Sequence, residues 1–371
     1  MEPFDTWKQD PGWADWRWQL RHAVRDPEVL SHWLGLTPEA SAAVRRTALR
    51  YPVLATPYYL ALADRAAADD PIIRQVLPDP RELAVNGAGS PDPLAERRDS
   101  PVPGLIHRYP DRALLLATHH CAVLCRHCMR KRAWQPGAPE EAPPTDFTQA
   151  LAYLREHTGI REVLISGGDP LLLPEETLFG LLAALQALPH LEIVRLGSRL
   201  PVVLPQRLTP EFCAQLGAAP PVWLATQFNH PRELTPETAL AVGNLLRAGI
   251  PVVNQTVLLR GVNDDAPTLA ALCTGLLRQR VKPYYLFHGD PVAGTLHFRT
   301  GVERGLELLA ELERSVSGLA VPAFAFDLPA GGGKVRLEPP RRCGALPDGT
   351  AVYRDREGQP RPYPDGRKSA P

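Results

Sequence analysis

Apolar residues follow two different rhythms along the chain, separated by a polar stretch. From about residue 12 to 70 they recur at three-to-four spacing, as Trp13, Trp16 and Leu20 do, which predicts amphipathic helices. The stretch from Leu77 to Pro103 is rich in Pro, Gly and Asp. Its Gly-x-Gly is followed at once by prolines and has no strand before it, so it does not fit a dinucleotide-binding turn. We interpret this stretch as a linker or an extended arm.

The rhythm changes at about residue 107, where short apolar runs begin to alternate with helical patterns. This alternation, with nearly continuous apolar strands, predicts an α/β fold in which helices cover a parallel sheet. Six strand–helix units are too few for an eight-fold barrel and suit a partial (βα)6 barrel or an open sheet. In both folds the chemistry belongs at the carboxyl ends of the strands. The strands are expected at 113–118, 162–167, 192–198, 222–228, 251–259 and 282–287, and helices at 147–157, 176–187, 235–248 and 266–279.

These patterns divide the chain into three parts. Residues 1–100 are expected to form an N-terminal helical region with the linker arm, and residues 101–320 the partial barrel. Residues 321–371 are expected to form a C-terminal segment, which begins with a further apolar run that ends in three glycines and a lysine.

The composition narrows the classes of function. The 371 residues are 44% hydrophobic and 22% charged, and the formal net charge is zero. Nucleic-acid-binding proteins usually carry a basic excess, so no nucleic-acid partner is expected. No uninterrupted apolar window of about 18 residues occurs, so we expect no membrane span. The N-terminus lacks the basic and apolar regions of a signal peptide, which predicts a cytoplasmic protein.

Three of the six cysteines lie close together, at Cys121, Cys125 and Cys128. A tight group of this kind in a large chain more often binds metal than forms disulfides. The group follows the first predicted barrel strand, and its three thiolates can hold three irons of a 4Fe–4S cluster while the fourth iron stays open. The alternatives are a zinc knuckle, for which His127 is the nearest fourth ligand, and a disulfide within the trio.

A glycine-rich turn closes the second predicted barrel strand, in the order Ser166, Gly167, Gly168, Asp169. Glycines at this place let the backbone approach a ligand closely. The alternative is an ordinary strand-to-helix turn in which Asp169 caps the following helix.

A second glycine run ends in Lys334, one of five lysines in the chain. The run lacks the full spacing of a phosphate loop, and Val335 stands where that loop needs Ser or Thr, so nucleoside triphosphate binding is disfavoured. A lysine after flexible glycines can form a Schiff base with pyridoxal phosphate (PLP). The alternative is a solvated lysine in a turn.

Two arginines, Arg108 and Arg112, come just before the first predicted barrel strand. A pair of guanidinium groups suits a phosphate dianion. The alternative for this arginine pair is a surface ion pair with Asp111.

The cysteine spacing after the first barrel strand resembles the radical S-adenosylmethionine (SAM) superfamily. From about residue 10 to 340 the chain also resembles the lysine 2,3-aminomutase family within it. The segments that carry this resemblance include SPVPGLIHRYPDRALLLATHHCAVLCRHCMRKR, LISGGDPLLL, FNHPRELTPE, VNQTVLLRGVNDD and FDLPAGGGK. The resemblance implies an isomerase that uses a 4Fe–4S cluster, SAM and PLP to interconvert L-lysine and β-lysine (3,6-diaminohexanoate) by a 1,2-amino shift.

The same resemblance implies a role for each matching residue. The three cysteines would hold the cluster, whose open iron binds the amino and carboxylate groups of SAM. Lys334 would be the catalytic lysine that holds PLP, and Arg108 and Arg112 would grip the PLP phosphate. Arg130 would pair with the substrate carboxylate. Contacts to SAM are expected from Ser166, Gly167, Gly168, Asp169, Gln255 and His230.

Two aspartates favour lysine as the substrate. In the lysine enzymes of the family, acidic residues at the positions of Asp290 and Asp327 receive the substrate ε-ammonium. A carboxylate and an ammonium about 4 Å apart attract each other by about 4 kcal/mol at an effective dielectric near 20. Two carboxylates facing a substrate without a cation would instead repel each other. The alternatives are an enzyme that modifies a lysine of elongation factor P and a 2,3-aminomutase for another amino acid. As partners we expect a small amino acid, an electron donor such as flavodoxin or ferredoxin, and further copies of the chain in a homo-oligomer.

Overall fold

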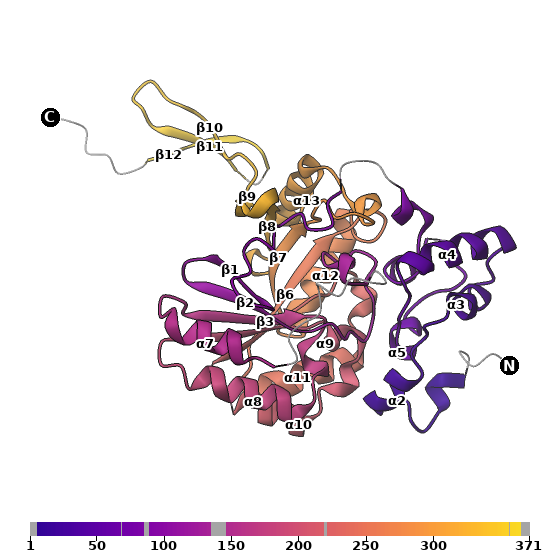
Figure 1. Cartoon of the computed structure of the whole chain (residues 1–371). Helices are drawn as coiled ribbons and strands as arrows, with labels where there is room; N and C mark the ends of the chain where they lie inside the picture. The colour runs from indigo at the N-terminus through magenta and orange to yellow at the C-terminus, as the bar shows by residue number, and fades with distance from the viewer. Residues whose placement is uncertain are drawn as a thin grey trace.

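The computed structural model describes residues 6–67, 69–84, 89–134, 146–218, 221–355 and 357–364 and is organised around one nine-stranded sheet (Figure 1). The strands follow one another in the sheet in the order of the chain, from β1 to β9. Strands β2 to β8 are parallel, whereas β1 and β9 pair antiparallel at the two edges. The strands are β1 Leu105–Tyr109, β2 Arg112–Thr118, β3 Glu162–Gly167, β4 Ile193–Gly197, β5 Val222–Thr226, β6 Val252–Leu258, β7 Lys282–His288, β8 Ala323–Leu328 and β9 Gly333–Leu337.

The six predicted barrel strands are confirmed as β2 to β7. The run that was expected to open a C-terminal segment supplies β8, a seventh parallel strand, and β9 then turns back along it. The last part of the barrel sheet therefore comes from residues beyond 320. This matters for the site because Lys334 lies on β9 and is carried by the sheet itself.

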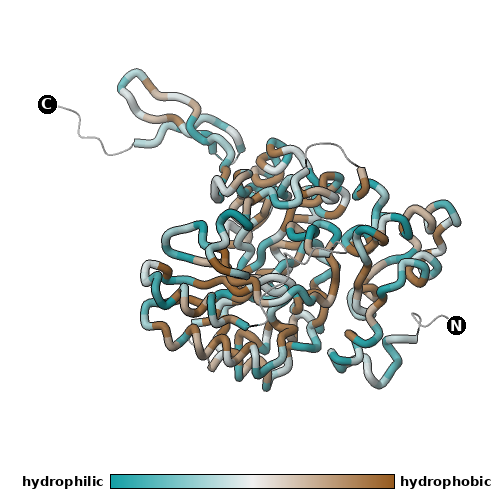
Figure 2. The backbone as a smooth tube through the Cα atoms, in the orientation of Figure 1, coloured by the Kyte–Doolittle hydropathy of each residue, from teal (hydrophilic) through white to brown (hydrophobic). Residues whose placement is uncertain are grey.

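Helices surround the sheet, and their apolar sides face it (Figures 1 and 2). In Figure 2 the helices below the sheet alternate between apolar and polar colours along their turns, as one-sided burial requires. Many begin with Thr or Asp as N-cap and Pro in the first turn, a placement that satisfies the free N–H groups and uses the fixed φ of proline. The helices are α7 Thr148–Glu156, α8 Glu175–Gln186, α9 Leu200–Val203, α10 Pro210–Gly217, α11 Pro236–Arg247, α12 Ala266–Arg278 and α13 Val302–Ser315.

The N-terminal region is helical, as the sequence predicts, and lies against the barrel (Figure 1). Thr56 donates a hydrogen bond of 2.7 Å to the backbone oxygen of Val203 on α9, and the guanidinium of Arg207 lies 4.7 Å from the ring of Trp16. These contacts dock the region beside the β4-to-α10 connection. Its helices are α2 Trp16–Arg21, α3 Pro27–Trp33, α4 Pro38–Arg50, α5 Pro57–Leu60 and α6 Pro71–Arg74.

The polar stretch predicted as a linker or arm contains local structure and contacts the barrel. It begins with the 3-10 helix η2 (Pro80–Leu83), and Ser90 forms a bridge with Val292 in the β7-to-α13 connection. Beyond the barrel, three short strands form a separate antiparallel sheet that projects from the body (Figure 1): β10 Arg342–Ala345, β11 Ala351–Arg354 and β12 Pro360–Tyr363. Among the described residues, no helix has the length and apolar character needed to cross a bilayer.

Candidate active site

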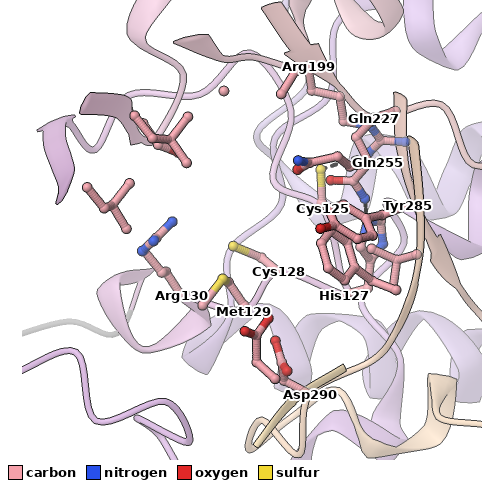
Figure 3. A pocket seen from close by; sticks show the side chains of 18 of the residues that line it. Cys125, His127, Cys128, Met129, Arg130, Arg199, Gln227, Gln255, Tyr285 and Asp290 are labelled. Carbon is pink, nitrogen blue, oxygen red and sulfur yellow. Dashed lines mark hydrogen bonds between the residues drawn. The ribbon is translucent and has the colours of Figure 1, made fainter. Parts of the chain in front are cut away.

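A cavity of about 710 Å³ lies at the carboxyl ends of the parallel strands. This is the place where parallel α/β sheets bring together residues from several strands. Nearly all predicted site residues line it, including the three cysteines at one end and Lys334, Asp290 and Asp327 at the other. Figure 3 shows Cys125, Gln227 and Gln255 on one side of this cavity, with Arg130 across from them and Asp290 below.

The three cysteines form the turn after β2 and all line the cavity. The backbone N–H of Cys128 donates to the oxygen of Cys125 at 2.8 Å, which closes the turn. Burial, with repulsion from the neighbouring cysteines, raises the pKa of Cys128 to about 11 and that of Cys121 well above its usual range. The sulfurs are therefore close enough to disfavour one another as thiolates, and a positively charged metal cluster would remove that penalty.

The zinc alternative finds no support in the geometry. His127 is partly buried, and its Nε2 accepts hydrogen bonds from the amides of Gln227 at 2.8 Å and Asn229 at 3.3 Å. Its ring is thus held by the end of β5 instead of completing a set of four ligands. No three His, Cys, Asp or Glu side chains in the described ranges are placed to hold a single metal ion. A cluster makes a different demand, because each cysteine binds a different iron.

The glycine turn after β3 packs against the segment that leads to Cys121. A side chain at Gly167 would meet the backbone oxygen of Thr118, one at Gly168 would meet that of His120, and Gly167 has a φ of +123°. Asp169 donates its backbone N–H to His120 at 2.7 Å. The two glycines are therefore required for the close approach of two backbones, which fixes the start of the cysteine turn.

The Asp169 side chain is buried and braces the end of β4. Its carboxylate accepts from the Ser198 hydroxyl and from the backbone N–H of Arg199, both at 2.8 Å, and it caps the 3-10 helix that starts at Pro170. Burial raises the pKa of Asp169 to about 6. The capping role that the sequence left open is thus present, and contact of Asp169 with SAM stays a prediction.

At the other end of the cavity, Lys334 faces Asp327 across the β8–β9 pair. Their register places the two residues opposite each other, and Lys334 Nζ lies 2.6 Å from Asp327 Oδ2. The same ammonium lies 4.0 Å from the centre of the Phe287 ring. Burial, with repulsion from Asp327, raises the pKa of Asp290 to about 6. Two carboxylates and one ammonium therefore share this end of the cavity.

The predicted phosphate-binding arginines lie at the edge of the cavity near β1. Arg108 donates from Nε to Asp99 at 2.8 Å and from Nη2 to the oxygen of Leu94. Arg112 lies 4.4 Å from the centre of the Tyr109 ring, and its Nε is 3.8 Å from Asp111, the pair expected as the alternative. Arg112 is the more available of the two, because its side chain is 43% exposed and its partner is distant.

A third arginine at this edge was missed by sequence reasoning. Arg336 lines the cavity and donates to the Tyr285 hydroxyl at 2.8 Å, and the Tyr285 ring stacks on Phe287. Its position two residues after Lys334 on a strand places both side chains on one face. That period-two relation was visible in the sequence once a strand, instead of a flexible arm, is assumed there.

Arg130 is held by a residue of the polar arm. Glu96 accepts from Arg130 Nη2 at 2.7 Å and from Arg132 Nη2 at 2.7 Å, and its side chain is 4% exposed. The two arginines hold the pKa of Glu96 below its usual range in spite of its burial. Glu96 lines the cavity and had no signal in the sequence, because it lies in a stretch that reads as a linker.

Two other predicted contacts differ in their placement. Gln255 on β6 lines the cavity, as expected. His230 is not among the lining residues, because its ring Nδ1 accepts from the backbone N–H of Arg232 and caps the short 3-10 helix Pro231–Glu233. The structure thus does not bring His230 to the predicted SAM site.

The residues present fit the three implied cofactors. Three converging cysteine sulfurs suit a cluster, and the glycine turn leaves backbone exposed to the cavity beside them. Lys334, with Arg112 and Arg336 nearby, suits a phosphorylated aldehyde such as PLP. Both groups of residues line one cavity, so groups held at its two ends would share the same enclosed space.

Known proteins similar to this chain point the same way. Residues 115–273 match the radical SAM superfamily model. The L-lysine 2,3-aminomutase of Fusobacterium nucleatum is 45% identical over 331 residues, 89% of this chain and 77% of its own length. That of Bacillus subtilis is 42% identical over 99% of this chain and 78% of its own length, and the glutamate 2,3-aminomutase of Clostridioides difficile is 39% identical over 88% and 77%.

These relatives align with 88% to 99% of this chain. Their identity and coverage are far beyond chance, and both the superfamily and the family expected from the motifs are confirmed. This chain is an enzyme of the isomerase class that belongs to the radical SAM superfamily and, within it, to the lysine 2,3-aminomutase family.

Proposed function

We propose that the protein is a PLP-dependent L-lysine 2,3-aminomutase acting on the free amino acid. The observation that carries this proposal is the ammonium site at the lysine end of the cavity. Asp327 binds the Lys334 ammonium at 2.6 Å, and Asp290 lies close enough to Asp327 for repulsion to raise its pKa. This end of the cavity is built to receive a cation, and a lysine substrate carries one at its far end.

Lys334 and the substrate would use this cation site in turn. Without ligands, the Lys334 ammonium neutralises Asp327. If Lys334 Nζ holds PLP, Asp327 would lose that partner, and the Arg299 guanidinium would be the remaining cation that acts on Asp290. The substrate ε-ammonium would replace the Lys334 ammonium, and the gain is large because Asp290 is mostly buried.

Arg130 is placed to hold the opposite end of the substrate. Nε and Nη2 of Arg130 donate hydrogen bonds to Glu96, which leaves Nη1 of Arg130 to bind the α-carboxylate of the substrate. Because Glu96 fixes the guanidinium, little conformational entropy is lost when a carboxylate binds. With the charges of both substrate ends fixed, the α- and β-carbons would lie between the cysteines and Lys334.

The cofactors would be held by residues at the two ends of this cavity. The proposed residues are Cys121, Cys125 and Cys128 for the cluster, the 166–169 turn and Gln255 for SAM, and Lys334, Arg108, Arg112 and Arg336 for PLP. When bound, the cluster with SAM supplies the radical, and PLP supplies the π-system through which the amino group moves. The protein positions the reacting carbons and excludes water. The electron would come from a small donor such as flavodoxin or ferredoxin.

Glutamate is the strongest competing amino acid, since a glutamate 2,3-aminomutase is among the relatives. Its side-chain carboxylate would face Asp290 and Asp327, and three like charges would repel one another. A lysine residue of elongation factor P carries the same side-chain cation. Its α-amino and carboxyl groups are in peptide bonds, so it has no free carboxylate to pair with Arg130. The free amino acid can use both Arg130 and the aspartates.

The test is an anaerobic assay with reconstituted enzyme. Iron and sulfide, PLP, SAM and dithionite are supplied, and L-lysine, L-glutamate and elongation factor P are incubated separately. Products are derivatised and separated by chromatography, because an α-to-β shift leaves the mass unchanged. We expect β-lysine from L-lysine, with loss in Asp327→Asn and no loss in the surface control Asp348→Asn, in the exposed turn before β11. Formation of β-glutamate alone, or modification of the factor alone, would contradict the proposal.

A further inference from the structure

A single buried arginine, Arg199, connects Cys125 to segments from several parts of the chain. It follows β4, and its guanidinium Nη1 donates to Cys125 Sγ at 2.7 Å. Its Nε donates to the backbone oxygen of Gln227 at the end of β5, at 3.2 Å. Its own backbone N–H is bound by Asp169, the residue that closes the glycine turn. Arg199 is thus tied by its side chain to the cysteine turn and the end of β5, and by its backbone to the glycine turn after β3.

The other nitrogen of this guanidinium is held by the N-terminal helical region. Nη2 donates to the Tyr59 hydroxyl on α5 at 3.0 Å and to the Gln75 side chain after α6 at 2.7 Å. It also pairs with Glu233 at 2.8 Å. The side chain of Arg199 is 9% exposed and that of Glu233 is 0% exposed.

Glu233 is itself fully engaged by neighbours. It accepts from the Tyr59 hydroxyl at 2.7 Å and from the Gln75 amide at 3.2 Å, and further backbone N–H groups approach its second oxygen. Gln75 also accepts the backbone N–H of Arg126, inside the cysteine turn, at 2.9 Å. The network holds the guanidinium at one fixed place relative to Cys125.

We propose that Arg199 is a positioning residue for the cluster, which fixes Cys125 Sγ and raises the reduction potential of the cluster bound there. Hydrogen bonds to cysteine sulfurs and nearby charge set the potential of iron–sulfur clusters. Reduction adds one negative charge to the cluster, and a guanidinium hydrogen-bonded to a ligand sulfur stabilises that charge. Because Tyr59 and Gln75 hold the guanidinium, the N-terminal helical region is part of the redox site.

The experiment compares midpoint potentials of the reconstituted, full-length protein. Potentials are measured by electron paramagnetic resonance during a redox titration, without amino acid substrate, so the result does not depend on which substrate is used. The main variant is Arg199→Met combined with Glu233→Gln, which removes the donor and the charge without leaving a buried carboxylate unpaired. We expect its equilibrium constant for one-electron reduction to fall at least tenfold, or about 59 mV in midpoint potential.

The matched control is Arg207→Met combined with Glu175→Gln. Arg207 is also buried and pairs with Glu175 at 2.9 Å, but it does not line the cavity. This control is expected to keep the wild-type potential even if it loses thermal stability. Equal potentials in the two double variants and the wild type would overturn the proposal.

A second variant covers the case in which the Arg199 variant does not retain its cluster. Tyr59→Phe removes one anchor of the guanidinium and leaves the cysteine contact itself untouched. We expect a smaller shift of the potential in the same, more negative, direction. An unchanged potential in Tyr59→Phe, when the Arg199 variant is empty, would reject the coupling of the N-terminal region to the cluster.

Discussion

The two ends of the cavity are built in different ways. At the cysteine end the charged groups are buried and paired inside the protein, as Arg199 is with Glu233 and Arg126 with Glu82. At the lysine end the Lys334–Asp327 pair is 28% and 17% exposed. Breaking a buried pair leaves a charge without water or partner and costs several kcal/mol, whereas a pair that water can reach is screened and costs less to break.

This difference matches what each end has to do. At the lysine end water reaches the Lys334–Asp327 pair, so its proposed exchange for PLP and a substrate costs less than breaking a buried pair. The cysteine end cannot loosen its pairs without losing stability, so its geometry stays constant while a redox group changes charge. Substitutions at the lysine end should therefore change catalysis alone, and substitutions at the cysteine end should also change stability.

The largest effect is expected for Lys334→Ala, which removes the proposed covalent anchor of PLP. We expect β-lysine formation to fall about 10⁴-fold or more, the scale at which deleting a covalent catalytic group acts. Iron content and the spectrum of the cluster should not change, because Lys334 lies at the other end of the cavity. The matched control is Lys282→Ala, whose ammonium donates to the backbone oxygen of Leu319. Activity retained within tenfold in Lys334→Ala would remove this lysine from the chemistry.

Glu82→Gln tests the cysteine end through stability. Glu82 pairs with both Arg126 and Lys131, and all three side chains are 0% exposed. We expect the free energy of unfolding to fall by about 3–5 kcal/mol, since two buried cations lose their counter-charge. Denaturant unfolding of the cofactor-free protein measures it. Glu192→Gln, at an exposed pair with Arg161, should change stability by less than about 1 kcal/mol. Similar losses in both variants would contradict the expectation that the buried Glu82 pairs are the more costly to break.

Asp327→Asn should weaken use of lysine without unfolding the protein. The variant loses a charge-assisted hydrogen bond to the substrate ammonium, a contribution of about 2–3 kcal/mol or roughly 100-fold in kcat/KM. Most of the change should be in KM if the ammonium is bound equally in the ground state and the transition state. Unaltered kcat/KM for lysine, measured at saturating cofactors, would place the ε-ammonium elsewhere.

The smallest effect concerns pH and Asp290. Burial and Asp327 raise the pKa of Asp290 to about 6, so this carboxyl is ionised at pH 7 and becomes protonated as the pH falls through 6. The neutral acid attracts an ammonium less, so kcat/KM for lysine should fall as the pH drops through 6 and level off near the value of the uncharged variant. In Asp290→Asn the overall value should be lower and this acidic limb should be absent. A limb that persists in the variant would belong to another group.

Much of the architecture followed from local pattern. Alternation of apolar runs and helical stretches predicted the six strands β2 to β7 within a few residues, because buried parallel strands must be apolar along their length. Helix starts such as Thr235 before Pro236 were also local signals. The prediction was wrong at the end of the barrel, where Gly331 to Gly333 suggested a flexible arm before Lys334. The structure shows a tight β8–β9 turn, with Gly331 and Gly333 at positive φ.

The residues of the candidate site also divide into those that local sequence patterns predict and those that only the structure reveals. Sequence alone determined the candidate residues that neighbours a few positions away mark out, namely the cysteine trio, the Gly167–Gly168 turn and the lysine after the glycines, and all of them line the cavity. Only the tertiary structure shows that Glu96, in the polar arm, and Arg199, after β4, belong to the site. Arg199 meets Tyr59 across 140 positions and Cys125 across 74, and spacing along a chain carries no information about such pairs. They exist because parallel strands deliver distant segments to one edge of a sheet, where burial forces every charge to find a partner.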